Sequence, residues 1–276
     1  LHTPLSVVYK YNMDWTRHPI LESFESQAIL LADRLVSPSQ ALIHEMDEQF
    51  PGLGKVELLP YPADPAYLEY PLNMTSEDEN VLYVGRLERR KGVETLIQAI
   101  PAFLTVCPKA TVHLIGGDTS LKPSQPSMKK HLQRLLPRRC RESVVFHAPI
   151  PREELIRMYL HARVCVFPSL FDNFPNTCME AMALGRPVIA TNNSGMAEMI
   201  EDGISGRIVP SGDVDSLTEA LIALYRAPLE DRRQIGTAAK ERMLNMFHPD
   251  RIADRFEALF SSSIVGTVRP AAEFRT

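Results

Sequence analysis

Short runs of apolar, mostly β-branched residues alternate with helix-forming segments from residue 81 to residue 226, and this alternation restricts the fold more than any other feature. The expected strands cover residues 81–85, 111–115, 143–146, 164–167, 188–190 and 207–209. The expected helices cover residues 92–104, 126–136, 152–162, 176–184, 195–201 and 214–226. Strands that are apolar on both faces and separated by helices predict a parallel sheet with right-handed crossovers. We therefore expect an α/β fold with a doubly wound, Rossmann-like parallel sheet.

The segments before and after this pattern predict additional helices. Residues 20–35 place apolar side chains at helical spacing, and the serines of Ser37-Pro38-Ser39 suit a turn and the cap of a second helix. A link with several prolines then leads to the regular pattern. Residues 229–246 and 249–262 predict two helices that finish the chain. We expect a smaller, partial α/β domain at the N-terminus.

Charge balance and motif content argue against several classes of function. Lys and Arg number 30 against 34 Asp and Glu, a formal net charge of -4, whereas proteins that bind duplex nucleic acid are usually basic. The cysteines form no C-x-x-C pair, so neither a zinc cage nor a redox centre is expected. No G-x-G-x-x-G or P-loop motif occurs, which argues against common nicotinamide-binding and P-loop proteins. We expect no nucleic-acid partner, no metal and no cofactor.

Basic residues follow the first strand of the regular pattern, where parallel sheets of this kind bind ligands. The segment from Gly85 to Gly92 contains Arg86 and Lys91 and opens a helix. A cation at a helix N-terminus meets the positive end of the dipole at a cost of about 0.3–1 kcal/mol, so an anion beside Lys91 is a reasonable expectation. The alternative is that Arg86 and Lys91 are solvated charges in one basic surface cluster with Arg89 and Arg90.

The segment from residue 167 to residue 187 is the richest in polar side chains, and it reads as strand, loop, helix and strand. Asp172 falls in the loop and Glu180 about one turn into the helix, so both carboxylates can face the strand ends. Asn176 or Thr177 suits the helix cap, which would leave backbone amides near an anionic ligand. Glu180 stands among apolar residues and needs a partner unless it faces solvent. A turn or cap role for Asp172 and an exposed position for Glu180 are the alternatives.

Taken together, these segments resemble the retaining glycosyltransferases of family four, which have a two-domain GT-B-type fold. The resemblance covers most of residues 20–260, and the order and spacing of its motifs are specific. Its strongest parts are Gly85-Arg86-Leu87 with Lys91-Gly92, Pro168-Ser169, residues 172–183 and residues 185–189. His2-Thr-Pro4, the helix with Glu22 and residues 32–39 look like the last third of the family's acceptor-side domain.

The resemblance implies roles for individual residues. It implies that Arg86 and Lys91 grip the diphosphate of a nucleoside-diphosphate sugar, and that Glu180 lies near the ribose hydroxyls. Asp172 occupies the position of the first glutamate in the family's E-x7-E pattern and is one methylene shorter. We expect catalytic roles for Arg86, Lys91 and Asp172. We expect donor binding by Gly85, Arg86, Lys91, Phe174, Pro175, Asn176, Thr177 and Glu180.

The activity that the resemblance implies is transfer of a sugar from a nucleoside-diphosphate sugar to an acceptor hydroxyl, with retention of anomeric configuration and without a metal. Fixed cations and helix amides can stabilise the departing diphosphate. The acceptor would be a sugar, a lipid-linked molecule or a small molecule. Two alternatives stay open: a nucleotide-sugar-binding module that is inactive without a missing N-terminal half, and a sugar-nucleotide epimerase. The motif at residues 172–183 favours a transferase.

The resemblance also predicts domain limits and surroundings. We expect a partial N-terminal domain and linker at 1–77, a nucleotide-sugar-binding domain at 78–246, and a crossover helix and tail at 247–276. The family's upstream glycine-rich loop and histidine cannot be assigned here, so we expect the first part of the N-terminal domain to be missing. An uncovered apolar surface predicts self-association. The absence of a signal sequence or spanning segment predicts a cytoplasmic protein; peripheral membrane association stays open, although no basic amphipathic helix is evident.

Overall fold

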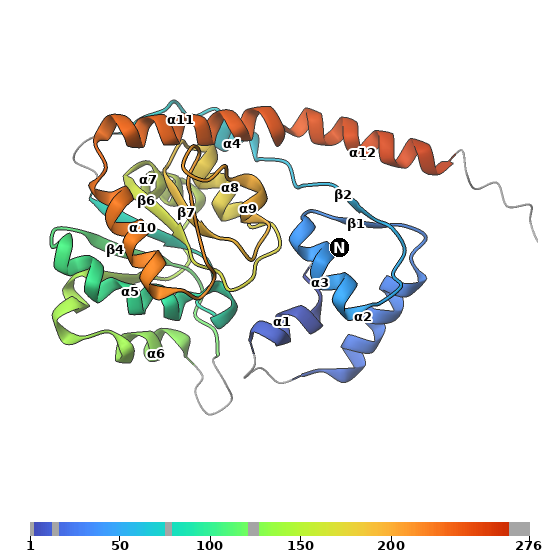
Figure 1. The fold of residues 1–276 in the computed structure, drawn as a ribbon, viewed down its shortest axis with the longest axis horizontal. Coiled ribbons are helices and arrows are strands. Elements are labelled where there is room, and N and C mark those ends of the chain that lie inside the picture. Colours follow the sequence, from blue (N-terminus) through green and yellow to red (C-terminus); the bar gives the residue numbers. More distant parts are fainter. Residues whose placement is uncertain (1–2, 13–16, 75–78, 121–126, 265–276) are drawn as a thin grey trace, which may run out of the picture.

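The computed structural model describes residues 3–12, 17–74, 79–120 and 127–264, and a six-stranded parallel sheet dominates it (Figure 1). The strands are β3 (Asn80–Val84), β4 (Thr111–Ile115), β5 (Val144–His147), β6 (Ala162–Phe167), β7 (Val188–Thr191) and β8 (Arg207–Val209). Their order in the sheet is β5-β4-β3-β6-β7-β8, and every neighbouring pair is parallel. The expected strands are confirmed, and the strands at the centre of the sheet, such as β6 and β7, are the most completely buried.

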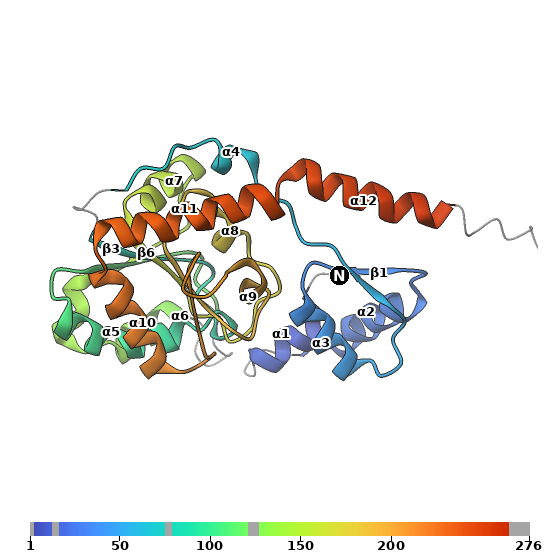
Figure 2. The ribbon, with the colours of Figure 1, turned by 45° about the horizontal axis from the view of Figure 1, so that its top comes forward.

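Helices cover both faces of this sheet (Figure 2). One core is formed with α5 (Val93–Val106), α6 (Met128–Leu135) and α10 (Val214–Arg226). The other is formed with α7 (Arg152–Leu160), α8 (Asn176–Ala183), α9 (Met196–Met199) and α11 (Leu229–Met246). The chain also forms two 3-10 turns, η1 (Arg89–Lys91) and η2 (Arg138–Ser143). The doubly wound, Rossmann-like α/β fold is therefore confirmed.

The N-terminal region forms a small second α/β unit. Its elements are α1 (Leu5–Tyr11), α2 (Pro19–Leu31), β1 (Leu35–Ser37), α3 (Gln40–Gln49) and β2 (Val56–Leu58). The short helix α4 (Pro65–Leu68) that follows packs on α8 and α11 of the large unit. The prediction of one helix over residues 20–35 is wrong at its end, because Leu35 pairs with Val56 in the parallel β1-β2 sheet. The predicted cap is confirmed: the Ser39 hydroxyl accepts a hydrogen bond of 3.1 Å from the amide of Leu42 in α3.

The last helix, α12 (Pro249–Ile264), returns from the large sheet to the N-terminal region, as Figures 1 and 2 show. Arg255 donates to the carbonyl oxygen of Leu58 at 3.0 Å, and Arg34 donates to that of Leu259 at 3.2 Å. These two hydrogen bonds join α12 to the N-terminal region. Within α12, Phe256 and Phe260 are half exposed. Residues 75–78 and 265–276, and with them one predicted domain limit and the predicted tail, lie outside the described residues.

Candidate functional site

The strand order reverses between β3 and β6, which makes the carboxyl ends of these two strands the expected ligand-binding crevice. From β3 the chain goes outward through β4 to β5, and it then returns to the other side of β3 as β6. Ligands of open α/β sheets bind at such a switch point. The segments that end here are the loop after β3, which carries Arg86 and Lys91, and the loop after β6, which carries Asp172.

Gly92 allows these two loops to touch. Its φ of 66° is left-handed, and a Cβ at this position would lie 1.7 Å from the carbonyl oxygen of Pro168. Any other residue would therefore force the η1 turn away from the end of β6. This close approach brings Arg90 and Lys91 to the loop after β6, although Asp172 follows them by about 80 residues in the sequence.

Glu88, Arg90, Lys91 and Asp172 form what we call the switch-point charge cluster. Arg90 donates to Glu88 Oε1 at 2.7 Å and to Asp172 Oδ1 at 3.2 Å, and Lys91 Nζ contacts Asp172 Oδ2. Their side chains are 0%, 5%, 15% and 9% exposed, respectively. Buried charges need partners, and here two cations balance two carboxylates.

Asp172 is held in its ionised form by its neighbours. Its Oδ1 also accepts from the amide of Asn173 at 3.1 Å, and Ser169 Oγ lies 3.4 Å from its Oδ2. Burial alone would raise the pKa of Asp172, but Lys91 and Arg90 outweigh burial and keep the pKa below its ordinary value of 3.8. Each carboxylate oxygen therefore has two donors, and Asp172 is a fixed, satisfied anion.

Arg86 lies beside this balanced cluster and adds one positive charge to it. Its side chain is 55% exposed, and its Nη2 lies 3.3 Å from Glu88 Oε1. Since Glu88 is already paired with Arg90 at a shorter distance, Arg86 is a surplus cation at the mouth of the crevice. An exposed guanidinium with several free donors suits the oxygens of an anionic ligand.

Glu180 lies in α8 in a second polar group, apart from the switch-point charge cluster. The hydroxyl of Tyr159 lies 3.1 Å from Glu180 Oε2 and 3.1 Å from the carbonyl oxygen of Thr177. Burial raises the pKa of Glu180 above its ordinary value, although Tyr159 and Arg152 oppose this. Burial and the charge of Glu180 together raise the pKa of Tyr67 to about 12. Glu180 is thus half-buried and has a neutral partner, which contradicts the exposed-face alternative.

The loop before α8 differs from the expectation in one respect. The helix cap is Pro175 and no side chain bonds to the first amides, so the predicted capping by Asn176 or Thr177 is wrong: Asn176 is already the first helical residue. The ring of Phe174 is buried against Tyr61 and Phe247. Only the backbone of Phe174 is therefore offered to a ligand, together with the first amides of α8, which lack intrahelical partners.

Residues of the N-terminal unit close one side of the crevice. Asn12 Oδ1 accepts from the amide of Arg90 at 2.9 Å, and Ser39 Oγ donates to Asn173 Oδ1 at 2.8 Å. A Cβ on Gly195 would lie 2.8 Å from the Cβ of Ser39 and 1.8 Å from the carbonyl oxygen of Asn173. Gly195 thus permits the close contact between the two units beside the site.

The structure therefore unites Arg86, Lys91 and Asp172 and places Glu180 with other partners. The sequence reasoning missed Glu88, Arg90 and Tyr159. Arg90 stood in a run of basic residues that is typical of an exposed surface, yet it is 4% exposed. Among the residues that the structure describes, no group of three His, Cys, Asp or Glu side chains could hold a metal ion. No helix in this part of the chain is long and apolar enough to cross a membrane.

The family model for glycosyl transferases group 1 matches residues 71–242, which is more than half of the chain and includes both loops of the crevice. The chain belongs to the glycosyl transferases group 1 family. Among curated members, it is 25% identical over 252 residues to glycogen synthase of Mycobacterium tuberculosis, which covers 91% of this chain. It is 29% identical over 230 residues to D-inositol 3-phosphate glycosyltransferase of Kribbella flavida, which covers 79% of this chain.

Solved glycosyltransferase structures share the fold. Sucrose-phosphate synthase of Thermosynechococcus elongatus superposes on this chain with a TM-score of 0.76 at 27% identity. The superposition covers 94% of this chain and 66% of the synthase chain. HepE of Anabaena, solved in complex with UDP and glucose, superposes with a TM-score of 0.71 at 18% identity, covering 86% of this chain and 65% of its own. The chain spans 59% and 54% of the two curated relatives named above.

Proposed function

We propose that this chain binds a nucleoside-diphosphate sugar at the crevice between β3 and β6 and that its protein transfers the sugar to an acceptor hydroxyl with retention of configuration. The observation that carries the proposal is Arg86, an exposed surplus cation above a buried, charge-balanced cluster at the switch point. Membership of the glycosyl transferases group 1 family and the UDP complex of the HepE neighbour support it.

In this proposal, Arg86 and Lys91 face the diphosphate together with the first amides of α8. Breaking the bond between sugar and diphosphate leaves negative charge on phosphate oxygens, and prearranged cations and helix amides stabilise that charge. This positive charge comes entirely from the protein, so we propose a transferase that works without a metal or other cofactor.

We assign Asp172 a positioning role rather than the direct contact with donor-sugar hydroxyls that the resemblance implies. Its oxygens accept from Arg90, Lys91, Asn173 and Ser169, so a sugar hydroxyl would have to displace one of these donors. Asp172 thereby holds the Lys91 ammonium at the crevice. Glu180 differs, because its hydrogen-bond partners, Tyr159 and Tyr67, are neutral hydroxyls rather than cations, and we assign it the role of accepting from ribose hydroxyls.

Retention requires the new bond to form on the face from which the diphosphate leaves. The acceptor oxygen bonds to the anomeric carbon while the bond from that carbon to the diphosphate oxygen breaks. The electron pair leaves with the diphosphate, which also takes the hydroxyl proton. No protein nucleophile is needed, which agrees with a crevice whose two buried carboxylates, Glu88 and Asp172, are both committed to cations.

A second candidate is a donor-binding module that does not transfer sugar by itself. In the part of the chain that the structure describes, the N-terminal unit has a sheet of two strands, which favours this candidate. Helix α2 also leaves Ile20, Phe24 and Leu31 more than half exposed. Such an apolar surface supports the expected self-association or coverage by further polypeptide.

The first candidate predicts that sugar is transferred to an acceptor, and the second predicts that the donor is bound without transfer. Incubation with UDP-, GDP- and ADP-sugars, a chelator and sugar acceptors should give a glycoside whose anomeric configuration, read by NMR, equals that of the donor. An inverted product would overturn the retaining mechanism, and dependence on added metal would overturn metal independence. Donor binding without transfer would favour the module.

The role of Glu180 has its own test. UDP should bind more tightly than 2′,3′-dideoxyuridine diphosphate, by about tenfold for a hydrogen bond to a charged group, and Glu180→Ala should abolish the preference. A preference that survives the substitution would mean that Glu180 does not contact the ribose.

A further inference from the structure

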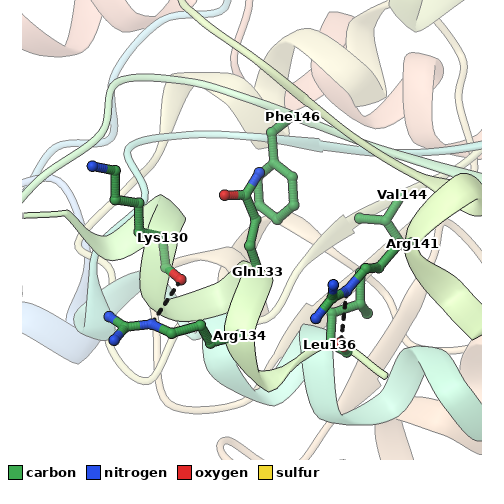
Figure 3. A pocket seen from close by; sticks show the side chains of 7 residues that line it. All are labelled: Lys130, Gln133, Arg134, Leu136, Arg141, Val144 and Phe146. Atoms are coloured by element: carbon green, nitrogen blue, oxygen red, sulfur yellow. Dashed lines mark hydrogen bonds between the residues drawn. The ribbon is translucent and has the colours of Figure 1, made fainter. Parts of the chain in front are cut away.

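A second cationic site lies far from the crevice, at the edge of the large sheet. An open cavity of about 620 Å³ is formed between α6, η2 and the edge strand β5 (Figure 3). Its charged lining consists of Lys130, Arg134 and Arg141, and none of the described residues that line it is acidic. Val144 and Phe146 point to the α5 and α6 face of the sheet, and β4 separates β5 from β3, so the cavity is distinct from the donor crevice.

The two arginines are held in place by the backbone. Arg134 donates through Nε to the carbonyl oxygen of Lys130 at 3.2 Å, and Arg141 donates through Nε to that of Leu136 at 3.4 Å. Figure 3 shows these two bonds on opposite sides of Gln133 and Phe146. Each bond fixes its guanidinium and leaves the terminal nitrogens available, which is the arrangement that binds oxyanions.

These cations have no carboxylate partner in the part of the chain that the structure describes, unlike Arg86, Arg90 and Lys91. They belong to six basic residues within 13 positions of a chain with net charge -4: Lys129, Lys130, Arg134, Arg138, Arg139 and Arg141. Concentrating like charges is unfavourable in the absence of an anion. The local charge therefore favours an anionic ligand.

The floor of the cavity is apolar. Leu136, Val144 and Phe146 line it, and Phe146 is only partly buried. Pockets of about 300–1,000 Å³ with an apolar floor and a few convergent polar groups are typical of small-molecule sites. A small inorganic anion would contact the basic side chains and leave the apolar floor uncovered. A ligand with a ring beside its anionic group would contact both.

We propose that this cavity is a second ligand site, for a small organic phosphate or sulfate whose anionic group lies between Arg134 and Arg141 and whose ring or apolar part covers Phe146. A membrane surface fits less well. Although α6 is a basic amphipathic helix, Met128 and Leu132 are buried in the core, and Leu135, at 43% exposed, is the one apolar side chain of this helix that could enter a bilayer.

Calorimetric titration at low salt with phenyl phosphate and inorganic phosphate tests the proposal. Phenyl phosphate should bind more tightly than inorganic phosphate, and Arg134→Ala and Arg141→Ala should each weaken it by about tenfold. Phe146→Leu keeps an apolar floor but removes the ring face, and it should reduce the advantage of phenyl phosphate over inorganic phosphate. Unchanged thermal unfolding midpoints would show that the arginine variants are folded.

Arg138→Ala and Arg139→Ala are matched controls, since both arginines are exposed members of the same basic segment and do not line the cavity. They should leave phenyl phosphate binding nearly unchanged, as should Arg86→Ala. Equal losses in all four arginine variants of the segment would show diffuse charge attraction, and a loss only in Arg86→Ala would place the probe in the donor crevice. Absence of binding, or arginine-dependent binding only to phosphatidylglycerol vesicles, would likewise overturn the proposal.

Discussion

Asp172 and Glu180 stand eight positions apart in one loop and helix, but their surroundings have opposite effects on them. Asp172 contacts two cations and two further donors, and its pKa is lowered because Lys91 and Arg90 outweigh burial. Glu180 is half-buried and bonded to a neutral tyrosine, and burial raises its pKa. Two carboxylates can thus acquire different roles from their partners, and we propose that Asp172 organises the cations of the site and that Glu180 binds the ligand.

The largest effect should follow removal of the charge of Asp172. Asp172→Asn leaves Arg90 and Lys91 buried with one anion fewer, and breaking a buried pair costs about 3–5 kcal/mol. Urea unfolding should show a loss of that size. Glu180→Gln is the matched control and should cost much less. Similar losses in both variants would remove the distinction between the two carboxylates.

Loss of the partner of Glu180 should have a smaller effect. Tyr159→Phe removes the hydroxyl that lies 3.1 Å from Glu180 Oε2, and a hydrogen bond to a charged group contributes about 1.5–3 kcal/mol. We expect a loss near the lower limit of that range, because Glu180 is only half-buried, and a further rise in the pKa of Glu180. Unfolding measurements and an NMR titration of the carboxyl group would check both. A loss as large as that of Asp172→Asn would contradict the account.

The smallest effect, but the sharpest comparison, is the pH dependence of stability. The stabilisation from Asp172 is present above its ordinary pKa of 3.8 and is lost as pH falls through the lower folded pKa. For Glu180, stability is greatest below its ordinary pKa of 4.5 and declines as pH rises through the raised folded pKa. As pH falls, the unfolding free energy of the wild type should therefore decrease relative to Asp172→Asn and increase relative to Glu180→Gln. Shifts of the same sign would contradict the pKa directions.

The local pattern of the sequence predicted most of the fold. Buried strands such as residues 111–115 are recognisable because both faces are apolar, and the helices between them fill the required crossovers. The end of α2 was mispredicted because Leu35 fits a helical stripe, and its pairing with Val56 depends on a segment about 20 residues away.

The candidate site was predictable only in part for the same reason. Arg86, Lys91, Asp172 and Glu180 stood out by motif, but the Lys91–Asp172 contact depends on the approach that Gly92 allows. Burial of Arg90 and the pairing of Tyr159 with Glu180 are properties of tertiary packing. A run of basic residues in a sequence does not indicate whether the folded protein exposes or buries their side chains.

The central claim is that the crevice beside Arg86 binds the diphosphate of the donor. Calorimetric titration with UDP, GDP and ADP in the presence of a chelator should show binding of one of them. Arg86→Ala and Glu180→Ala should each weaken it by about tenfold or more, and Arg138→Ala should not. If a nucleoside diphosphate binds the Arg86→Ala variant as tightly as the wild type, or if none binds the folded chain, the assignment of this crevice is wrong.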